Sequence, residues 1–471
     1  MNVLLVNPCS AIWNAPKQIP LGLAYLASTL ENDGHKVKIL DMNIDKDFDS
    51  ELKKEYDIVG FTATTPTIKT VWRLAEHIKI VSSSQVIVGG PHVSALPLES
   101  IEKLGINAVV VGEGEETLKE ICARIESKKT LEGVKGCVYK ENEHIIDNGP
   151  RPLITDIDSL PFPAFHLFNI EKYGNAQPIR DYKKDARSFY IFTSRGCPYG
   201  CLFCSKSLYG RTFRPRSPEN VVEEWQILVN EYKATEIGMQ DDIFNFNKAR
   251  ALKICSMIKA QGLDIPWITC NGIRTNHTDY ELLVAMKNAR CYRVGYGVES
   301  GCKRILDFLQ KSQTLDMIEN AFKVTKKAGL ESMGFFMIGN PTETEETIDQ
   351  TIKFAIKLDP TIAHFTISAP FPGTQIRKIV EENGKLLITD WDQYGILEGK
   401  AFFEYGELKA KTIEAKWHQA YRRFYLRPRR VMCELVKLNN WRNLPIITKS
   451  SVRFFVKGSA EKEETNQAIT C

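Results

Sequence analysis

The chain has 471 residues, of which 43% are hydrophobic and 25% charged, with a formal net charge of +4. This length predicts about two to four domains, and no apolar run reaches the roughly eighteen residues that cross a bilayer. The N-terminus enters a strand pattern without a basic segment or a cleavage site, so we expect a cytoplasmic protein. Its 12 cysteines should then be buried thiols or metal ligands rather than a disulfide framework.

Residues 1–130 alternate short β-branched runs with helical patterns, which is typical of a doubly wound parallel α/β sheet. We expect helices at 21–32 and 68–81, between strands at 2–6, 36–40, 57–61, 85–89 and 107–111. Five such strands predict a flavodoxin-like (Rossmann-like) domain. Ligands of these sheets bind beyond the carboxyl ends of the strands, so the candidate loops are 7–10, 62–65, 89–92 and 112–117.

Residues 131–185 are rich in Gly, Pro and Asp and predict an extended connector. A second α/β alternation covers 186–400, with helices expected at 218–232, 248–261 and 343–358. Strands are expected at 189–193, 236–240, 267–270, 292–297, 332–338 and 362–368. Six βα units are too few for an eight-stranded barrel, so we predict a partial (β/α)6 TIM-type barrel with its chemistry at the carboxyl strand ends.

The last region, 401–471, is basic, rich in aromatic residues and expected to be helical. Between residues 416 and 457 stand eleven Lys or Arg and one acidic residue, a net +10, so the rest of the chain carries −6. One interpretation is a helix that covers the barrel with its charges solvated. The other is peripheral contact with an anionic membrane at the inner face, or with a lipid-like substrate. Nucleic acid is a less favoured partner.

Three cysteines, Cys197, Cys201 and Cys204, follow the first strand of the second α/β region in the pattern C-x3-C-x2-C. Three thiolates from one loop can hold three corners of an iron–sulfur cube and leave one iron open. A structural zinc is the alternative, but it needs a fourth ligand. No second C-x2-C occurs, and the nearest histidines in the sequence are His166 and His277.

This motif, with an aromatic residue before its third cysteine, resembles the radical S-adenosylmethionine (SAM) family over residues 186–400. The resemblance implies a [4Fe–4S] cluster that chelates SAM, a one-electron reductant such as flavodoxin or ferredoxin, and cleavage of SAM to a 5′-deoxyadenosyl radical. It also implies SAM contacts at later strand ends, from Gln240, Asp241, Asp242, Arg274, Glu299, Gly339 and Pro341. Taken singly, each of these residues could equally be part of turn or capping chemistry.

With this motif downstream, the first domain resembles the cobalamin-binding domain that precedes many radical SAM cores. The matching stretches are 20–27, 60–64, 88–92 and 111–115. Nucleotide or flavin binding is the alternative, but G-x-G-x-x-G and P-loop motifs are missing. The resemblance implies cobalamin contacts from Thr62, Thr64, Thr65, Gly89, Gly90, His92, Gly112, Glu113, Gly114 and Thr117.

Proteins that ligate cobalt through histidine carry D-x-H-x-x-G after the first strand, where this chain has Asn7-Pro8-Cys9-Ser10. The resemblance therefore implies base-off cobalamin without a protein histidine on cobalt. We expect His92 to contact the corrin and not the metal.

Together the two resemblances imply methylation of an unactivated carbon, through an adenosyl radical and methylcobalamin. The alternatives are oxidative cyclisation or rearrangement with the same cofactors and, from another class, a non-catalytic cobalamin or iron–sulfur sensor. We assign no catalytic residue, because cofactors carry the difficult steps. The substrate is expected to be a small or lipid-like molecule, and the sequence does not identify it.

Overall fold

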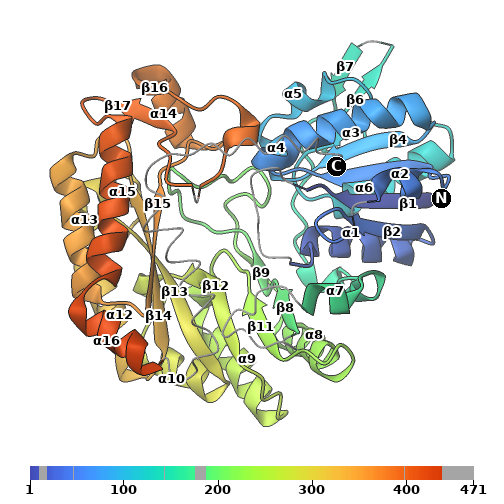
Figure 1. Cartoon of the computed structure of the whole chain (residues 1–471). Coiled ribbons are helices and arrows are strands. Elements are labelled where there is room, and N and C mark those ends of the chain that lie inside the picture. Colours follow the sequence, from blue (N-terminus) through green and yellow to red (C-terminus); the bar gives the residue numbers. More distant parts are fainter. Residues whose placement is uncertain (10–17, 46, 143, 175–186, 397, 438–471) are drawn as a thin grey trace.

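The computed structural model describes residues 1–9, 18–45, 47–142, 144–174, 187–396 and 398–437. Figure 1 shows two α/β domains side by side, the first in blue and the second in green to orange, with α15 and α16 along the far side of the second. Parts of three predictions lie outside the described residues: position 10 of the first loop, 175–186 of the connector and the tail beyond 437.

The N-terminal domain holds a seven-stranded sheet in the order β2-β1-β3-β4-β5-β6-β7, whose first five strands pair in parallel. These strands are β1 (Asn2–Asn7), β2 (Lys36–Asp41), β3 (Ile58–Thr62), β4 (Gln85–Gly89) and β5 (Ala108–Val110). The helices are α1 (Leu21–Asn32), α2 (Phe48–Leu52), α3 (Ile68–Val81), α4 (Pro91–Ala95), α5 (Pro97–Ile101) and α6 (Glu115–Glu126). The order 2-1-3-4-5 confirms the doubly wound, flavodoxin-like prediction.

Part of the expected connector joins this sheet. Strands β6 (Cys137–Glu141) and β7 (His144–Asp147) form a hairpin that pairs antiparallel with β5. Cys137, Val138 and Tyr139 are buried against the core, which accounts for the pairing. The polar residues around them hide this short apolar run in the sequence. Helix α7 (Ile170–Gly174) follows, and the domain boundaries at 130, 185 and 400 stay a prediction.

The second domain holds six parallel strands in the order β15-β14-β13-β12-β11-β8, which confirms the partial parallel barrel. The strands are β8 (Ser188–Ile191), β11 (Glu236–Met239), β12 (Trp267–Ile273), β13 (Cys291–Glu299), β14 (Glu331–Ile338) and β15 (Ile362–Ile367). The helices between them are α8 (Pro218–Asn230), α9 (Lys248–Ala260), α10 (Tyr280–Asn288), α11 (Lys303–Phe308), α12 (Leu315–Lys327) and α13 (Glu345–Leu358). Figure 1 shows α10, α12 and α13 on the side away from the N-terminal domain.

The segment after β15 folds back towards the N-terminal domain (Figure 1). It contains α14 (Gln375–Asn383), the 3-10 helix η6 (Trp391–Gln393) and the antiparallel pair β16 (Gly384–Leu386) and β17 (Phe403–Tyr405). Trp391 Nε1 donates to Glu99 at 2.8 Å, and Lys69 Nζ donates to Asp390 at 2.9 Å. The C-terminal part of the chain is thereby fastened to the first domain.

Helices α15 (Ala410–Tyr425) and α16 (Pro428–Lys437) form the described part of the basic tail. The Tyr421 hydroxyl bridges the N–H and C=O of Phe365 at 3.2 and 3.1 Å, and the Tyr425 hydroxyl does the same at Ala363, at 3.0 and 2.9 Å. The cation of Arg427 lies 2.6 Å from Asp359. These contacts support the interpretation of the tail as a cover of the barrel, here over its edge strand β15.

Candidate active site

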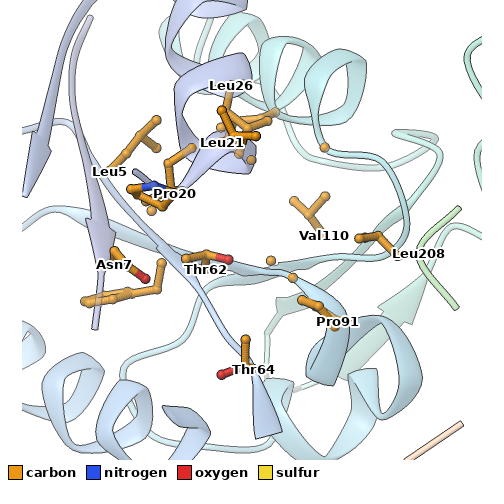
Figure 2. A pocket seen from close by; sticks show the side chains of 18 of the residues that line it. Leu5, Asn7, Pro20, Leu21, Leu26, Thr62, Thr64, Pro91, Val110 and Leu208 are labelled. Carbon is orange, nitrogen blue, oxygen red and sulfur yellow. The ribbon is translucent and has the colours of Figure 1, made fainter. Parts of the chain in front are cut away.

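A cavity of about 580 Å³ lies at the carboxyl ends of β1, β3, β4 and β5. Figure 2 shows Leu21 and Leu26 of α1 and Val110 of β5 around it, with Thr62 and Thr64 at the end of β3. Its position is the one that the doubly wound sheet predicts for a ligand. The lining is mostly apolar, and such walls exclude water from a bound molecule.

The second domain completes this cavity. Phe192, Leu208, Tyr209 and Gln240 all line it, and they follow the first two strands of the partial barrel. The Gln240 amide donates to Gln18 at 3.1 Å, on the segment that leads into α1. The cavity is therefore shared by the two domains.

Glycines allow the backbone of the loops to lie close to this cavity. Gly90 has a φ of +106°, and a Cβ there would lie 2.7 Å from the nitrogen of Ala63. Gly22 and Gly112 line the cavity as well, and a Cβ on either would meet no protein atom within about 3.9 Å. Bare backbone on several sides leaves room for a large ligand.

Seven of the ten residues predicted to contact cobalamin line this cavity: Thr62, Thr64, Gly89, Gly90, Gly112, Glu113 and Gly114. Thr65, His92 and Thr117 do not. The Thr117 hydroxyl instead donates to the carbonyl of Lys135 at 3.2 Å. The residues of α1 that line the cavity were not among the predicted contacts, although 20–27 was one of the matching stretches.

His92 serves the contact between the domains. Its Nδ1 lies 3.3 Å from the Thr65 hydroxyl and its Nε2 lies 3.2 Å from Glu99. The ring packs edge-on against Trp391 at 5.2 Å, and it is almost completely buried. Both ring nitrogens are thus engaged by protein groups. Desolvation alone would raise the pKa of Glu99, but His92 and Trp391 hold it below its usual value.

The three motif cysteines lie in a loop closed by the short antiparallel pair β9 (Ser194–Arg195) and β10 (Arg214–Pro215). Cys197, Cys201 and Cys204 are free thiols and partly exposed. The loop begins with Gly196 at a φ of +77°, where a Cβ would lie 2.3 Å from the carbonyl oxygen of Thr212. Among the described residues, no set of three His, Cys, Asp or Glu side chains converges on one metal ion.

Two acidic residues after β11 hold this loop in place. Asp241 is buried and accepts from the N–H of Thr193 at 2.6 Å and from the Ser194 hydroxyl at 2.7 Å. Desolvation raises the pKa of Asp242, although Lys206 and the N–H of Gly196 in the loop act in the opposite direction. Asp241 thus has a structural role, and the contacts of Asp242 and Gln240 with SAM stay a prediction.

Arg274 and Glu299 flank the cysteine loop. The Arg274 guanidinium lies 3.5 Å from the ring centroid of Tyr199, between the first two cysteines, and donates to the carbonyl of Lys311. Glu299 forms an ion pair with Lys311 at 2.7 Å, both side chains being about nine-tenths buried, and the same Nζ lies 5.4 Å from the Phe203 ring. Both predicted SAM residues are therefore placed beside the loop, and their contact with SAM stays a prediction.

Gly339 and Pro341 lie in the turn after β14. Gly339 has a φ of +80°, and a Cβ there would lie 2.8 Å from Ile413 of α15. Glu343 closes the turn by accepting from the N–H groups of Gly339 and Asn340 at 2.8 and 2.9 Å. Burial raises the pKa of Glu343 to about 7. From the sequence, Glu343 is expected at the start of the helix over 343–358 and not as a group that closes the turn.

A buried ion-pair network joins the cavity to the cysteine loop. Arg195 donates to Glu113 at 2.8 Å and to Glu115 at 2.6 Å, and Arg214 donates to Glu113 at 2.7 Å. All four side chains are at most 6% exposed. Desolvation would lower the pKa of Arg195, but the neighbouring acidic groups raise it. Because Glu113 lines the cavity and Arg195 precedes Gly196, the network fixes the two sites relative to each other.

Comparison with known proteins agrees with this arrangement. Residues 15–122 match the B12 binding domain family, and residues 191–355 match the radical SAM superfamily. An uncharacterised methyltransferase of Pyrococcus horikoshii is 39% identical over 444 residues, which cover 91% of this chain and 93% of that protein. The chain belongs to the cobalamin-dependent radical SAM family.

Two further proteins resemble this chain over most of its length. An anaerobic magnesium-protoporphyrin IX monomethyl ester cyclase of Cereibacter sphaeroides is 27% identical, over 87% of this chain and 67% of that protein. The structure of the radical SAM methyltransferase TsrM from Kitasatospora setae, with cobalamin and a [4Fe–4S] cluster bound, superimposes with a TM-score of 0.72 and 20% identity. It covers 90% of this chain and 88% of that one, and it has the same fold.

As a member of this family, the chain is an enzyme whose cofactors are cobalamin, a [4Fe–4S] cluster and SAM. Radical SAM enzymes in general act on small molecules and take electrons from an external reductant. The described residues fit these groups, since three free thiols share one loop and the glycine-lined cavity is roomy and apolar. Within the described ranges, no helix has the length and apolar character to cross a membrane.

Proposed function

We propose that this enzyme methylates an unactivated carbon of a small-molecule substrate, with SAM as the methyl donor and cobalamin as the carrier. The observation that carries the proposal is the cavity shared by both domains. Gln240 and Tyr209 of the radical SAM domain border the same space as Thr62 and Gly90 of the B12 binding domain. A methyl carrier in this cavity would lie next to the loop of Cys197 to Cys204.

When bound, the cluster and SAM supply the radical that activates a C–H bond, and cobalamin supplies the methyl group. In this proposal the three cysteines hold the cluster, and Asp241 and Arg274 keep their loop in position. The apolar wall of Leu26 and Val110 keeps water away from reactive species. The protein thus orients and shields, which agrees with the lack of an assigned catalytic residue.

We also propose that cobalamin binds base-off without a protein histidine on cobalt. None of the described residues that line the cavity is a histidine. His92 lies nearby in sequence, but Thr65 and Glu99 engage both of its ring nitrogens. Thr62 and Thr64 would then border the lower face of the corrin.

Electron delivery and membrane contact extend the proposal beyond the site. We expect a flavodoxin or a ferredoxin as the reductant. Peripheral membrane contact is supported by Leu426, Val431 and Met432, which are exposed beside the cations of the tail. The cation of Arg427 is instead paired with Asp359. Pelleting with anionic vesicles that is lost at high salt would support this contact, and pelleting that does not depend on salt would remove it.

The test uses the full chain, reconstituted under anaerobic conditions with iron, sulfide and hydroxocobalamin. With a low-potential reductant and SAM that carries a deuterated methyl group, we expect 5′-deoxyadenosine and labelled methylcobalamin, both detected by mass spectrometry. Release of 5′-deoxyadenosine without label on cobalamin would refute methyl transfer and favour the cyclisation or rearrangement that the cyclase relative suggests.

The test variant is Cys201→Ala, which changes a cysteine of the motif. Its control is Cys302→Ala, because Cys302 is also partly exposed but lies outside the motif. Cys201→Ala should lose 5′-deoxyadenosine formation and the iron–sulfur absorbance but keep cobalamin binding. Cys302→Ala should keep all three. Equal loss in both variants would contradict the assignment of the cluster to the motif.

A further inference from the structure

A second cavity, of about 300 Å³, lies where three distant segments of the chain meet. The B12 binding domain contributes the start of η1 (Thr65–Thr67) with Thr64, and the cysteine loop contributes Phe203 and Ser205. The segment after β15 contributes Phe371 and Ile396. Among its described lining residues, Thr64 and Thr65 are the two that the sequence predicted as cofactor contacts, and Pro91 belongs to the predicted loop 89–92.

This cavity adjoins both cofactor sites. Thr64 and Pro91 line it and also line the larger cavity, so the two spaces share a wall. On the other side, Phe203 and Ser205 flank Cys204 in the chain. A molecule in the second cavity would therefore lie between the corrin site and the cluster loop, where a carbon must be placed to lose hydrogen and gain a methyl group.

The walls of the cavity are held in place before any ligand arrives. Tyr394 is buried, and its hydroxyl accepts from Arg377 at 2.6 Å. Three residues before it, Trp391 is bonded to Glu99 across the domain interface. Gly373 has a φ of +76°, and a Cβ there would lie 3.3 Å from the Ser205 hydroxyl. Such anchoring makes the shape of the cavity a property of the folded chain.

The chemistry of the lining selects the occupant. Six of the cavity's thirteen described lining residues carry phenyl, phenol or proline rings, four are Ser or Thr, and none is Lys or Arg. A phosphate or another strong anion would find no countercharge there. The one carboxylate, Glu398, already lies 3.4 Å from Lys400. The volume is at the lower end of the range of about 300–1,000 Å³ for ligand pockets, which is small for a porphyrin macrocycle or a long lipid chain.

We propose that this second cavity is the substrate site and that the substrate is a compact, largely apolar ring compound without a phosphate group. The proposal rests on the proposed function, because the location matters only if methyl transfer occurs between the two cofactors. It replaces the broad expectation of a small or lipid-like molecule by one chemical class.

The test uses indole as a compact apolar probe and the full chain loaded with cobalamin, with binding followed by saturation-transfer NMR and calorimetry. Two variants introduce Trp into the segment after β15: Ile396→Trp fills the cavity, and Leu387→Trp lies outside its lining. We expect the wild type and Leu387→Trp to bind indole equally and Ile396→Trp to bind at least tenfold more weakly.

Three results would overturn the proposal: no indole binding by the wild type, equal affinity in both variants, or tighter binding of uridine 5′-monophosphate than of indole. Ile396→Trp should keep the far-ultraviolet circular dichroism spectrum of the wild type, and Leu387→Trp should also still bind cobalamin and release 5′-deoxyadenosine. If the wild type fails in those two assays, the proposed function fails, whereas the comparison of indole affinities judges the cavity separately.

Discussion

Replacement of Glu113 by Gln tests whether the buried ion-pair network joins the two domains. The carboxylate faces two guanidiniums, Arg195 and Arg214, and also accepts from the N–H of Ile154 at 2.9 Å. Glutamine keeps the volume but removes the charge, which leaves one carboxylate, Glu115, for two buried cations. Loss of one partner from a buried pair costs about 3–5 kcal/mol. The retained amide oxygen favours the lower end, near about 3 kcal/mol.

The assays are urea unfolding followed by tryptophan fluorescence, and cobalamin titration followed by absorbance. Because Glu113 also lines the cavity, Glu113→Gln should lower cobalamin affinity at least about tenfold, which is about 1.4 kcal/mol. Glu120→Gln is the matched control, because Glu120 pairs with Arg151 at the surface and is 36% exposed. It should change stability by less than about 1 kcal/mol. Equal small losses in both variants would refute the reasoning.

Three further changes test other parts of the structure. Gly90→Ala should cost about 1–3 kcal/mol in thermal unfolding, because a Cβ there would lie 2.7 Å from the nitrogen of Ala63. Gly133→Ala should cost less, because Gly133 also has a positive φ, of +80°, but has free space around it; the reverse ranking would contradict the role of Gly90. The pKa of Glu343 is raised in the folded state to about 7, so its contribution is fully present below its unfolded pKa, near 4.5, and is lost as the pH rises through 7. Glu343→Gln should remove that decline from a series of urea titrations between pH 5 and 8, and an unchanged slope would refute the assignment. Tyr425→Phe leaves the N–H and C=O of Ala363 without the hydroxyl, and we expect a loss of about 1–3 kcal/mol in urea unfolding; no loss would mean that water replaces it.

The sequence predicted both sheets well because each strand has a strong local signal. Runs such as Val3 to Val6 are continuously apolar and begin and end with β-branched valine. Turn residues follow them, so neither the strands nor the loops at their carboxyl ends depend on distant partners. The same locality predicted the three cysteines. The hairpin of β6 and β7 was not predicted, because its apolar run is short and its burial depends on pairing with β5.

Side-chain roles that depend on distant partners could not be predicted. His92 follows the glycines of a cofactor loop in the sequence, but Trp391, some 300 residues later, determines where its ring packs. Arg195 and Glu113 are 82 residues apart, and nothing in the local sequence of either residue indicates that they pair. The second cavity is still harder to foresee, because its three walls come together only in the folded chain.

The hydroxyl groups of Tyr421 and Tyr425 give helix α15 a role that its charge pattern conceals. An open parallel sheet leaves one row of main-chain donors and acceptors on each outer strand, ready to recruit a strand from another molecule. Here two phenols occupy that row at Ala363 and Phe365. We expect a chain shortened before Ala410 to expose this row and to self-associate.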